Sequence, residues 1–537
     1  CYSGRYYRRV GNTGLLKAVE MNRGKTVARE KKVVWQDAVI AVALGTLIIV
    51  GILGVARTIW SGYHFLDDHE LIRIEQSAKQ GQPLFTTMRT WIHNDLTWRF
   101  RPFYWVERVT AGYLFGSNLT AWNIWTAIKG ILAFALLYMT ARFLKYGRSI
   151  STLFAMVIML GVQFTPWYRS ANQENTGLLL CAGALCLIAA QYNRKAYKKA
   201  AYNIPIIILV VLAGLEKESF TLFMPVFPAL KLWLEYWDGC DASWEGTRRK
   251  GRFWRLLKEN SITYVLILLA MLVNVYMILF RVGVDHVSYA GFHKDTGLGQ
   301  YFQGIRTSLL QNMKWNTIIA GLLLFMVLLC YQLIERYNIR KYLSLCVLMF
   351  GAMCVQLVAH ARSGMWERYL FPYVIAYAFL FVLLGYRIFE KDRFRSKIYV
   401  VVLLLLLANT VPGSVRAARD YAKTGEWVAE YFSCILDNTT SADRIVSAFG
   451  DEELDMATEC WLEVHDRTQV FSNINGEWKN TMQLVDSLQG DCSWENVKVV
   501  TCYGYAQVYT LSLMEDGISA DDFDTYTFGD YMVMVRK

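Results

Sequence analysis

Long apolar runs constrain this chain more than any other feature. The sequence has 537 residues, of which 54% are apolar and only 19% are charged, whereas soluble domains are about 25% charged. Several runs reach the roughly 18 apolar residues that a helix needs to cross a bilayer. We therefore predict a polytopic α-helical membrane protein with about eleven transmembrane helices. They are expected near residues 36–58, 120–143, 149–166, 175–192, 203–215, 219–236, 261–281, 315–334, 342–360, 369–388 and 398–412.

Clusters of Lys and Arg separate these runs and predict the orientation of the chain. They occupy residues 23–32, 142–148, 193–199, 248–258, 335–341 and 387–397. With the spans above, all of them fall on one side, which the positive-inside rule makes the cytoplasmic side. We predict a multi-pass protein of the plasma membrane, surrounded by membrane lipids, with a cytoplasmic N-terminus. The first outer loop at 61–119 then lies outside the cell.

Composition divides the chain further. We expect residues 1–20 to be a non-native or upstream leader, 21–35 a basic cytoplasmic N-terminus and 36–412 the transmembrane domain. Residues 413–537 carry 9 Lys and Arg against 22 Asp and Glu, a balance of −13, so the remainder carries +24 within the total of +11. This acidic part mixes helix-like and strand-like segments, which predicts a small extracytoplasmic α/β domain. Because orientation explains the basic loops, no nucleic-acid partner is predicted.

The cysteines form no metal-binding pattern. There are eleven, without a CxxC pair, and those inside apolar runs are expected to be small core residues. Cys434, Cys460, Cys492 and Cys502 lie in the acidic part. In an exported domain they could form two disulfides, and spacing does not predict the pairing.

An acidic segment follows the first apolar run. Asp67, Asp68 and Glu70 stand in "SGYHFLDDHELIRI" at the outer edge of the membrane. One interpretation is helix capping, with Asp67 as the N-cap and Glu70 reaching back as in a capping box. The other is catalytic, because a carboxylate placed beside an acceptor hydroxyl serves as a general base.

Two arginines lie downstream in the same loop. Arg99 and Arg101 flank Phe100 in "WRFRPFYW". Guanidinium groups make bidentate contacts to phosphate oxygens, so a lipid-linked phosphate would suit them. Snorkelling of both side chains toward the headgroups is the alternative.

Further charged residues interrupt later apolar runs. Glu216, Lys217 and Glu218 break "GLEKESF", and ionisable groups at membrane depth are expensive and usually functional. A short outer turn with a Glu–Lys pair is the alternative. Glu174 in "ANQENTG" either caps the following span or faces a site. Arg368 and Tyr369 in "WERYLFP" either anchor the interface or line the same site. We name Glu70, Arg99, Arg101, Glu174, Lys217, Glu218, Arg368 and Tyr369 as candidate substrate-binding residues.

The sequence predicts no metal site. His64 and Asp68 stand four residues apart, but no third ligand follows at a matching spacing. A divalent metal stays open as an alternative, and no other cofactor is indicated. Nucleotide binding lacks support because no glycine-rich loop followed by GK[ST] occurs.

Taken in order, several of these segments resemble the multi-spanning glycosyltransferases of the GT-C superfamily. That group includes protein O-mannosyltransferases and bacterial enzymes that glycosylate cell-surface polymers. The resemblance covers about residues 30–390 and is carried by "LDDHE", "RFRPFYW", "PWYRSANQENTG", "GLEKESF" and "WERYLFP". It implies a sugar donor on a polyprenyl or dolichyl phosphate and transfer on the extracytoplasmic face. It also implies that Asp67 and Asp68 form the acidic pair of the first outer loop, which we name as the catalytic candidates.

We therefore predict an inverting, GT-C-like glycosyltransferase of the hexosyltransferase class. It would transfer sugar from a polyprenyl-phosphate donor to a glycan, lipid or protein acceptor, with a first-loop Asp as general base. A transporter or flippase for lipid-linked glycans, a polysaccharide polymerase or ligase and a non-enzymatic scaffold are the alternatives.

Overall fold

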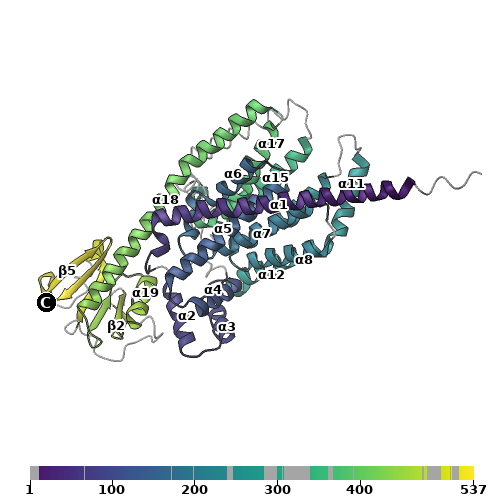
Figure 1. Cartoon of the computed structure of the whole chain (residues 1–537). Coiled ribbons are helices and arrows are strands. Elements are labelled where there is room, and N and C mark those ends of the chain that lie inside the picture. Colours follow the sequence, from purple (N-terminus) through teal and green to yellow (C-terminus); the bar gives the residue numbers. More distant parts are fainter. Residues whose placement is uncertain are drawn as a thin grey trace, which may run out of the picture.

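A helical part and a small sheet lie at opposite ends of the molecule and are joined by one long helix (Figure 1). This computed structural model describes residues 11–65, 67–170, 172–196, 199–238, 246–283, 299–300, 302–304, 306, 339–360, 367–390, 392–474, 477–479, 497–507, 510 and 519–537.

Within the described residues, seven helices are long and apolar enough to cross a membrane. They are the Val33–Ala56 part of α1 (Gly11–Ala56), α5 (Leu119–Phe143), α7 (Glu174–Asn193), α12 (Ser261–Tyr276) with the π-helical turn Met277–Gly283, α15 (Ile339–Ala359), the run from α16 (Phe371–Ala378) through the π-helical turn Phe379–Leu384 to α17 (Gly385–Phe389), and α18 (Arg393–Asp437). Two apolar helices are shorter: α6 (Arg148–Met159) and α8 (Ala200–Gly214).

The predicted number of about eleven spans is therefore not confirmed. The span expected at 149–166 ends at Met159, because Gly161 turns the chain with φ 121° and a 3-10 helix, Val162–Trp167, follows. The span expected at 219–236 is divided into α9 (Glu218–Phe223) and α10 (Val226–Trp237), with Pro225 between them. The expected span at 315–334 lies outside the described residues.

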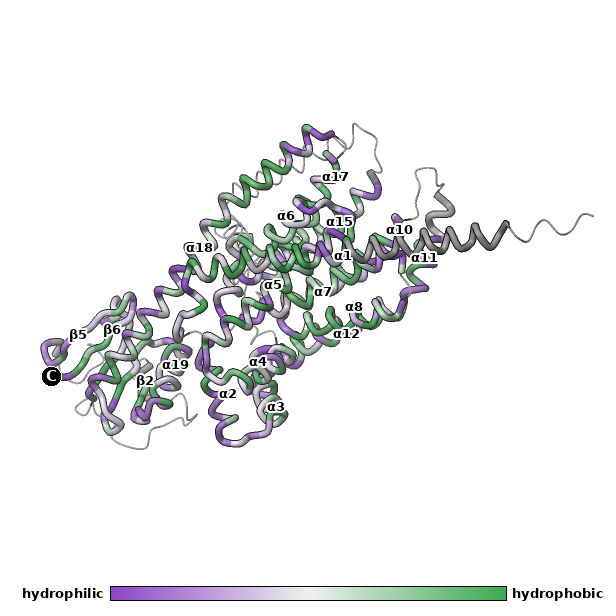
Figure 2. The backbone as a smooth tube through the Cα atoms, in the orientation of Figure 1, coloured by the Kyte–Doolittle hydropathy of each residue, from purple (hydrophilic) through white to green (hydrophobic). Residues whose placement is uncertain are grey.

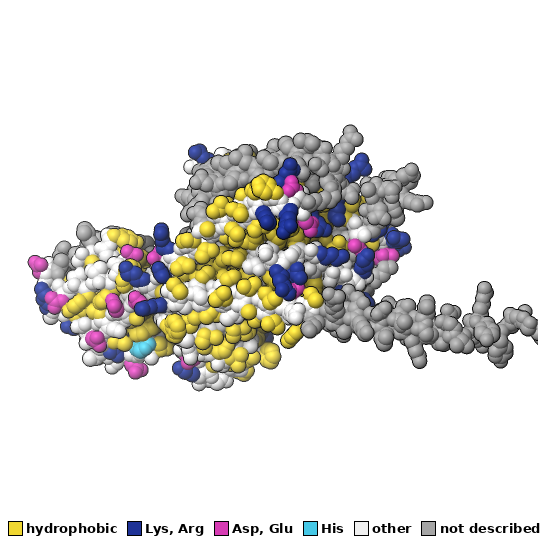
Figure 3. Space-filling view, turned by 45° about the horizontal axis from the view of Figure 1, so that its top comes forward, with side chains coloured by type: hydrophobic (Ala, Val, Ile, Leu, Met, Phe, Trp, Pro, Cys, Tyr) yellow, Lys and Arg dark blue, Asp and Glu magenta, His cyan; other side chains and the backbone are white. Residues whose placement is uncertain are grey.

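The helical part is apolar on its surface as well as in its core. Figure 2 shows hydrophobic residues along α5, α7, α8 and α12, and Figure 3 shows a broad hydrophobic face over the helices. Exposed apolar side chains include Leu47 on α1, Ile262 on α12 and Val347 on α15. Apolar side chains that face outward on several long helices indicate a surface that contacts lipid.

Several basic segments lie close together at one end of the helical part, where polar contacts join them. Asp37 near the start of the apolar stretch of α1 binds Arg142 at 2.7 Å and Arg148 at 2.9 Å. The guanidinium of Arg387 lies 5.7 Å from the ring centre of Tyr146. Residues from three predicted basic clusters or their neighbours thus share this end, away from the sheet.

The first outer loop folds as a compact helical unit. It contains α2 (His69–Lys79), α3 (Leu84–Asp95) and α4 (Pro102–Phe115), after a short 3-10 helix, Thr58–Trp60. Pro102 suits the first turn of α4 because it has no backbone N–H to leave unpaired. The buried side chains that join these helices are Ile74, Met88, Tyr104, Trp105 and Val109.

The C-terminal part is a mixed sheet flanked by helices. Its strands are β1 (Arg444–Ser447), β2 (Val470–Ile474), β3 (Glu477–Lys479), β4 (Val497–Tyr503), β5 (Phe523–Phe528) and β6 (Tyr531–Arg536), in the order β3-β2-β1-β4-β6-β5. β1 is parallel to β2 and β4, and the remaining pairs are antiparallel. α19 (Glu452–Glu463) connects β1 to β2.

α18 links this sheet to the helical part without a break. It runs from Arg393 to Asp437 and contains Pro412, so the expected domain boundary at 413 falls inside a helix. Its last turns pack Val428, Tyr431, Phe432 and Ile435 into the core of the sheet domain. Cys434, Cys460 and Cys502 are free thiols, and Cys492 lies outside the described residues.

Candidate active site

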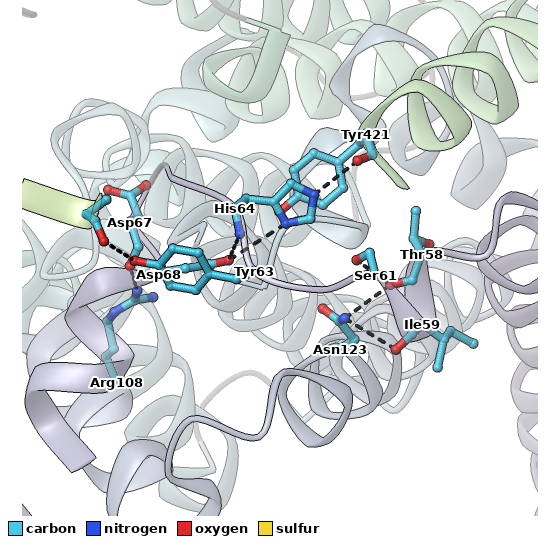
Figure 4. A network of polar contacts seen from close by, with 11 residues as sticks. Thr58, Ile59, Ser61, Tyr63, His64, Asp67, Asp68, Arg108, Asn123 and Tyr421 are labelled. Carbon is cyan, nitrogen blue, oxygen red and sulfur yellow. Dashed lines mark hydrogen bonds and ion pairs between the residues drawn. The ribbon is translucent and has the colours of Figure 1, made fainter. Parts of the chain in front are cut away.

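The segment that carries Asp67 and Asp68 lies where the helical part meets the sheet domain, because the ring of Phe65 packs against that of Tyr531 in β6. Figure 4 shows the polar contacts of this segment. Asp67 adopts a left-handed conformation with φ 64°, which Asp tolerates better than most residues. Asp68 is 2% exposed, and its Oδ2 accepts a hydrogen bond from the backbone N of His64 at 2.8 Å. The His64 ring stacks on Tyr421 of α18, with ring centres 3.7 Å apart. The acidic segment is thus a tight, anchored turn.

The capping-box interpretation of this turn is wrong. The residue before α2 is Asp68, not Asp67, and no side chain caps the helix. The carboxylate of Asp68 is used by His64, and that of Glu70 points to α4. Tertiary contacts have replaced the local hydrogen bonds that a capping box would supply.

Arg108 of α4 holds the acidic turn through contacts with Asp67 and Glu70. Its guanidinium donates to the backbone O of Asp67 at 2.6 Å and binds the carboxylate of Glu70 at 2.6 Å. Glu70 also accepts from the hydroxyl of Tyr104 at 2.8 Å. Arg108 is 1% exposed, so this is a desolvated and hydrogen-bonded ion pair. Glu70, a predicted substrate-binding residue, is therefore occupied in holding α2 against α4.

The environment of Asp67 favours its ionised form. Burial alone would raise the pKa of Asp67, but the positive charges of Arg108, Arg368 and Arg101 outweigh burial and hold this pKa below its usual value. Asp67 is half-buried, in contrast to Asp68. The structure therefore gives the two acidic candidates different surroundings: Asp67 is a partly accessible carboxylate, and Asp68 is an internal acceptor.

The two predicted arginines also differ. Arg101 makes three hydrogen bonds to the carboxylate of Asp95, between 2.9 and 3.2 Å, and its guanidinium lies 4.5 Å from the ring centre of Tyr104. This fork already fills the bidentate geometry that a phosphate would use. Arg99 is half-buried and lies close enough to Lys217 to lower the pKa of that lysine.

Four other predicted residues meet in a second cluster. Lys217, just before α9, forms a buried ion pair with Glu174 at the start of α7. Arg368 approaches Glu174 at 3.9 Å and donates to Asn172 Oδ1 at 3.1 Å. The Lys217 ammonium lies 3.8 Å from the ring centre of Tyr369. Residues about 200 positions apart in the sequence thus form one cationic cluster, and its Arg368 also acts on Asp67.

Glu218 and Glu216 lie differently. Glu218 begins α9 and is half-buried, and no hydrogen bond or ion pair joins its carboxylate to another described residue. Glu216 is fully buried, and neither carboxyl oxygen has a hydrogen-bond partner among the described residues. Burial, followed by the negative charge of Glu107, raises the pKa of Glu216 well above its usual value. The surroundings of Glu216 therefore favour the neutral form of its carboxyl group.

Sequence reasoning missed Arg108, Lys129 and Glu107. Lys129 is 3% exposed and binds Glu107 at 3.1 Å, Asn175 Oδ1 at 2.8 Å and Thr176 Oγ1 at 3.0 Å. Charged side chains within the predicted span at 120–143 and in "WVERVTAGYLF" were the available signal.

Space beside this site is lined by both parts of the molecule. A pocket of about 260 Å³ lies next to Asp68, between α2 and α19. Its lining includes Tyr63, Glu75, Trp461 and His465. The indole of Trp461 stacks on the ring of His465 with ring centres 3.8 Å apart, so part of the lining is aromatic. Among the described residues, no group of three or more His, Cys, Asp or Glu side chains is arranged to hold a metal.

The fold is predominantly helical, with helices apolar enough to cross a membrane and a C-terminal sheet domain. The sheet domain contributes to a charged site. No family model and no curated protein matches the chain. One similar solved structure is the crystal structure of the oligosaccharyltransferase of Archaeoglobus fulgidus, described as a complex with Zn and sulfate. The similarity has a TM-score of 0.42 and 14% sequence identity and covers 93% of this chain and 73% of the other. A likeness this distant does not define a family.

Proposed function

We propose that the protein is an integral-membrane glycosyltransferase that uses a polyprenyl-phosphate-linked sugar. The acceptor would be a hydroxyl group of a cell-surface glycan, a glycolipid or a protein. The observation that carries this proposal is the half-buried carboxylate of Asp67 beside a cluster that contains Lys217 and Arg368. A base and a phosphate clamp within one site are what such a transfer requires.

Asp67 acts as the general base. As the acceptor oxygen attacks the anomeric carbon, its proton moves to the Asp67 carboxylate. The bond from the anomeric carbon to the phosphate oxygen breaks, and the lipid phosphate departs with the electron pair. Attack on the face opposite to the leaving group inverts the anomeric configuration. Arg108 and Arg368 keep Asp67 ionised before the reaction, since both lower its pKa.

Lys217 and Arg368 stabilise the departing phosphate. Both are anchored by Glu174, so their positive charges are in place before the donor binds. Preorganised charges in a dry site stabilise developing negative charge strongly, because they need no reorganisation during the reaction. Arg99 adds a further positive charge near Lys217. Arg101 serves a structural role in this proposal, because Asp95 occupies its guanidinium.

The position of the site suits a lipid-linked donor. The site lies at the end of the apolar helices, where polyprenyl chains would stay in the bilayer while the phosphate reaches the charged cluster. The basic segments around Arg142, Arg148 and Arg387 lie at the other end. If this basic end is cytoplasmic, the reaction takes place on the extracytoplasmic face.

Asp67→Asn and Asp68→Asn, assayed in lipid nanodiscs with a set of polyprenyl-phosphate hexoses, test the proposal. We expect Asp67→Asn to lower the transfer rate by about 10²- to 10⁴-fold, the usual contribution of a general base. Asp68→Asn should act mainly through folding, because Asp68 is buried and bonded to His64. Asp524→Asn, on the exposed face of β5, is the matched control. Full activity in both loop variants would refute the base assignment.

The same assay separates the enzyme from the transporter and polymerase alternatives. A transferase keeps its activity in detergent, where the two sides of a membrane no longer exist. A flippase loses its measurable function there. Mass spectrometry of lipids copurified with the protein distinguishes a monophosphate sugar donor from the diphosphate-linked oligosaccharide that a polymerase or ligase would use.

A further inference from the structure

The sheet domain brings a carboxyl group into the site. Glu453 lies in the first turn of α19, and its carboxyl group is close enough to that of Asp67 to affect its titration. Two carboxyl groups at this separation can share a hydrogen bond only when one of them carries a proton. A contact between parts of the chain almost 400 residues apart thus brings a second carboxyl group to the candidate base.

The placement of Glu453 is anchored on both sides. Asp451, the N-cap of α19, accepts from the backbone N of Glu453 at 3.0 Å. Asp455, one turn on, accepts from Ser447 Oγ at 2.6 Å and from the backbone N of Phe449 at 3.2 Å. The start of α19 is thus fixed to the end of β1.

The acidic turn is fixed to the same helix from its own side. The hydroxyl of Tyr63 donates to the backbone O of Ala457 at 3.1 Å, and Cys460 Sγ lies 3.9 Å from the backbone O of His69. Tyr63 and His69 lie on either side of Asp67 in the sequence, and both contact α19. The two carboxyl groups are therefore brought together by a packed interface between the acidic turn and α19.

The charges around the pair are unequal. Asp67 is influenced by Arg108, Arg368, His69 and Arg101, and all of these lower its pKa. For Glu453, burial and then the negative charges of Asp67, Asp451 and Glu70 raise the pKa to about 7. These surroundings favour the proton on Glu453 and the negative charge on Asp67.

We propose that Glu453 is a positioning residue that acts through Asp67 and makes the sheet domain part of the proton-accepting machinery. This inference rests on the proposed transferase function. With Glu453 protonated, its O–H occupies a lone pair of Asp67 and weakens Asp67 as a base. With Glu453 ionised, the pair carries two negative charges and takes up one proton. The acceptor oxygen bonds to the anomeric carbon as its O–H bond breaks, and the proton ends between the two carboxylates. The bond from the anomeric carbon to the phosphate oxygen breaks, and the lipid phosphate leaves with its electron pair.

The pH–rate profile of the full-length protein in nanodiscs, with the same polyprenyl-phosphate hexoses, tests this role. The wild type should lose activity below about pH 7, where Glu453 gains its proton. In Glu453→Gln the acidic limb should move to lower pH, because Asp67 no longer has a like charge beside it. The plateau rate should fall by roughly tenfold, because Asp67 becomes a weaker base. Glu463→Gln, an exposed change on the same helix, should leave the profile unchanged.

Infrared titration of carboxyl groups provides a readout without substrate. Glu453→Gln should remove a protonated-carboxyl signal that titrates near pH 7, and Asp67→Asn should move that signal to lower pH. Burial also raises the pKa of Asp455 to about 7, so its signal should persist in both variants as an internal reference. An unchanged infrared titration or an unshifted acidic limb in Glu453→Gln would overturn the proposal. If the infrared coupling is present but the wild type transfers no sugar, the proposed function fails and the pair stands.

Discussion

At the scale of single residues, Lys217 illustrates how burial changes the pKa of a charged group. Its ammonium is 5% exposed, paired with Glu174 and placed over the ring of Tyr369. Burial lowers the pKa of Lys217 to about 8, although Glu174 opposes this effect. A lysine with this pKa is charged at neutral pH and becomes neutral in mildly alkaline solution.

We predict an alkaline limb for donor binding. Below about pH 8 the ammonium is present, and as the pH rises through that value Lys217 loses its proton and its attraction for phosphate. The KM for a polyprenyl-phosphate sugar should therefore rise above pH 8, with a smaller change in kcat. Lys217→Met should show the high KM at all pH values. Lys217→Arg, which stays charged, should lose the alkaline limb. A wild-type KM that is independent of alkaline pH would contradict this role.

At the element scale, close contact between α7 and α9 sets the geometry of the cationic cluster. Glu174 begins α7, and Lys217 directly precedes α9. One turn into α7, Gly177 lies against the ring of Phe220 on α9 so closely that a Cβ would overlap the ring. The glycine permits the approach that brings the ammonium to the carboxylate.

Gly177→Ala should therefore separate these helices. The Phe220 ring is 1% exposed and has little room to move. We expect a loss of about 1–3 kcal/mol in the free energy of unfolding, which is typical of overpacking. The KM for donor should rise together with it. Gly51→Ala is the control, because no atom lies within 4 Å of its added Cβ. Thermal unfolding in nanodiscs compares the two, and equal stability would argue against a packing role for Gly177.

Part of the fold and the site could be predicted at this scale. The positions of charges at the edges of apolar runs indicated Glu174, Lys217, Arg368 and Tyr369, and the structure brings these four residues together. Asymmetry within the acidic pair could not be predicted, because it depends on which carboxylate His64 uses. The partner of Arg101 was also hidden, since Asp95 is six residues away and no pattern marks it.

Contacts between segments that are distant in the sequence were harder to predict than the charged residues of the site. Hydropathy indicated the span at 398–412, but it did not indicate that α18 continues to Asp437 and enters the sheet domain. The contact between Glu453 and Asp67 depends on that helix and on the packing of α19. Nothing in the sequence near Asp67 indicates contact with Glu453, and nothing near Glu453 indicates contact with Asp67. The contribution of the sheet domain to the site is therefore a property of tertiary structure.

At the scale of the whole molecule, one aromatic side chain joins the acidic turn to the sheet domain. Phe65 is 3% exposed and lies two residues before Asp67. Its ring contacts those of Tyr431, Phe432, Phe449 and Tyr531, with ring centres 4.9 to 5.7 Å apart. Two of these partners belong to α18, and the others follow β1 and begin β6. The turn is thus inserted into the core of the sheet domain.

Phe65→Ala should loosen the sheet domain from the helical part while leaving each part folded. Removal of a fully packed Phe costs about 3–5 kcal/mol, and here the loss falls on the interface. We expect faster proteolysis near the end of α18, a loss of coupling between Glu453 and Asp67 in the infrared titration, and reduced transfer. Phe85→Ala, in the same loop but 80% exposed, is the matched control. Because the donor cluster at Glu174 and Lys217 lies outside this interface, donor binding should survive in Phe65→Ala. Simultaneous loss of donor binding and transfer would show instead that the sheet domain supports the whole site.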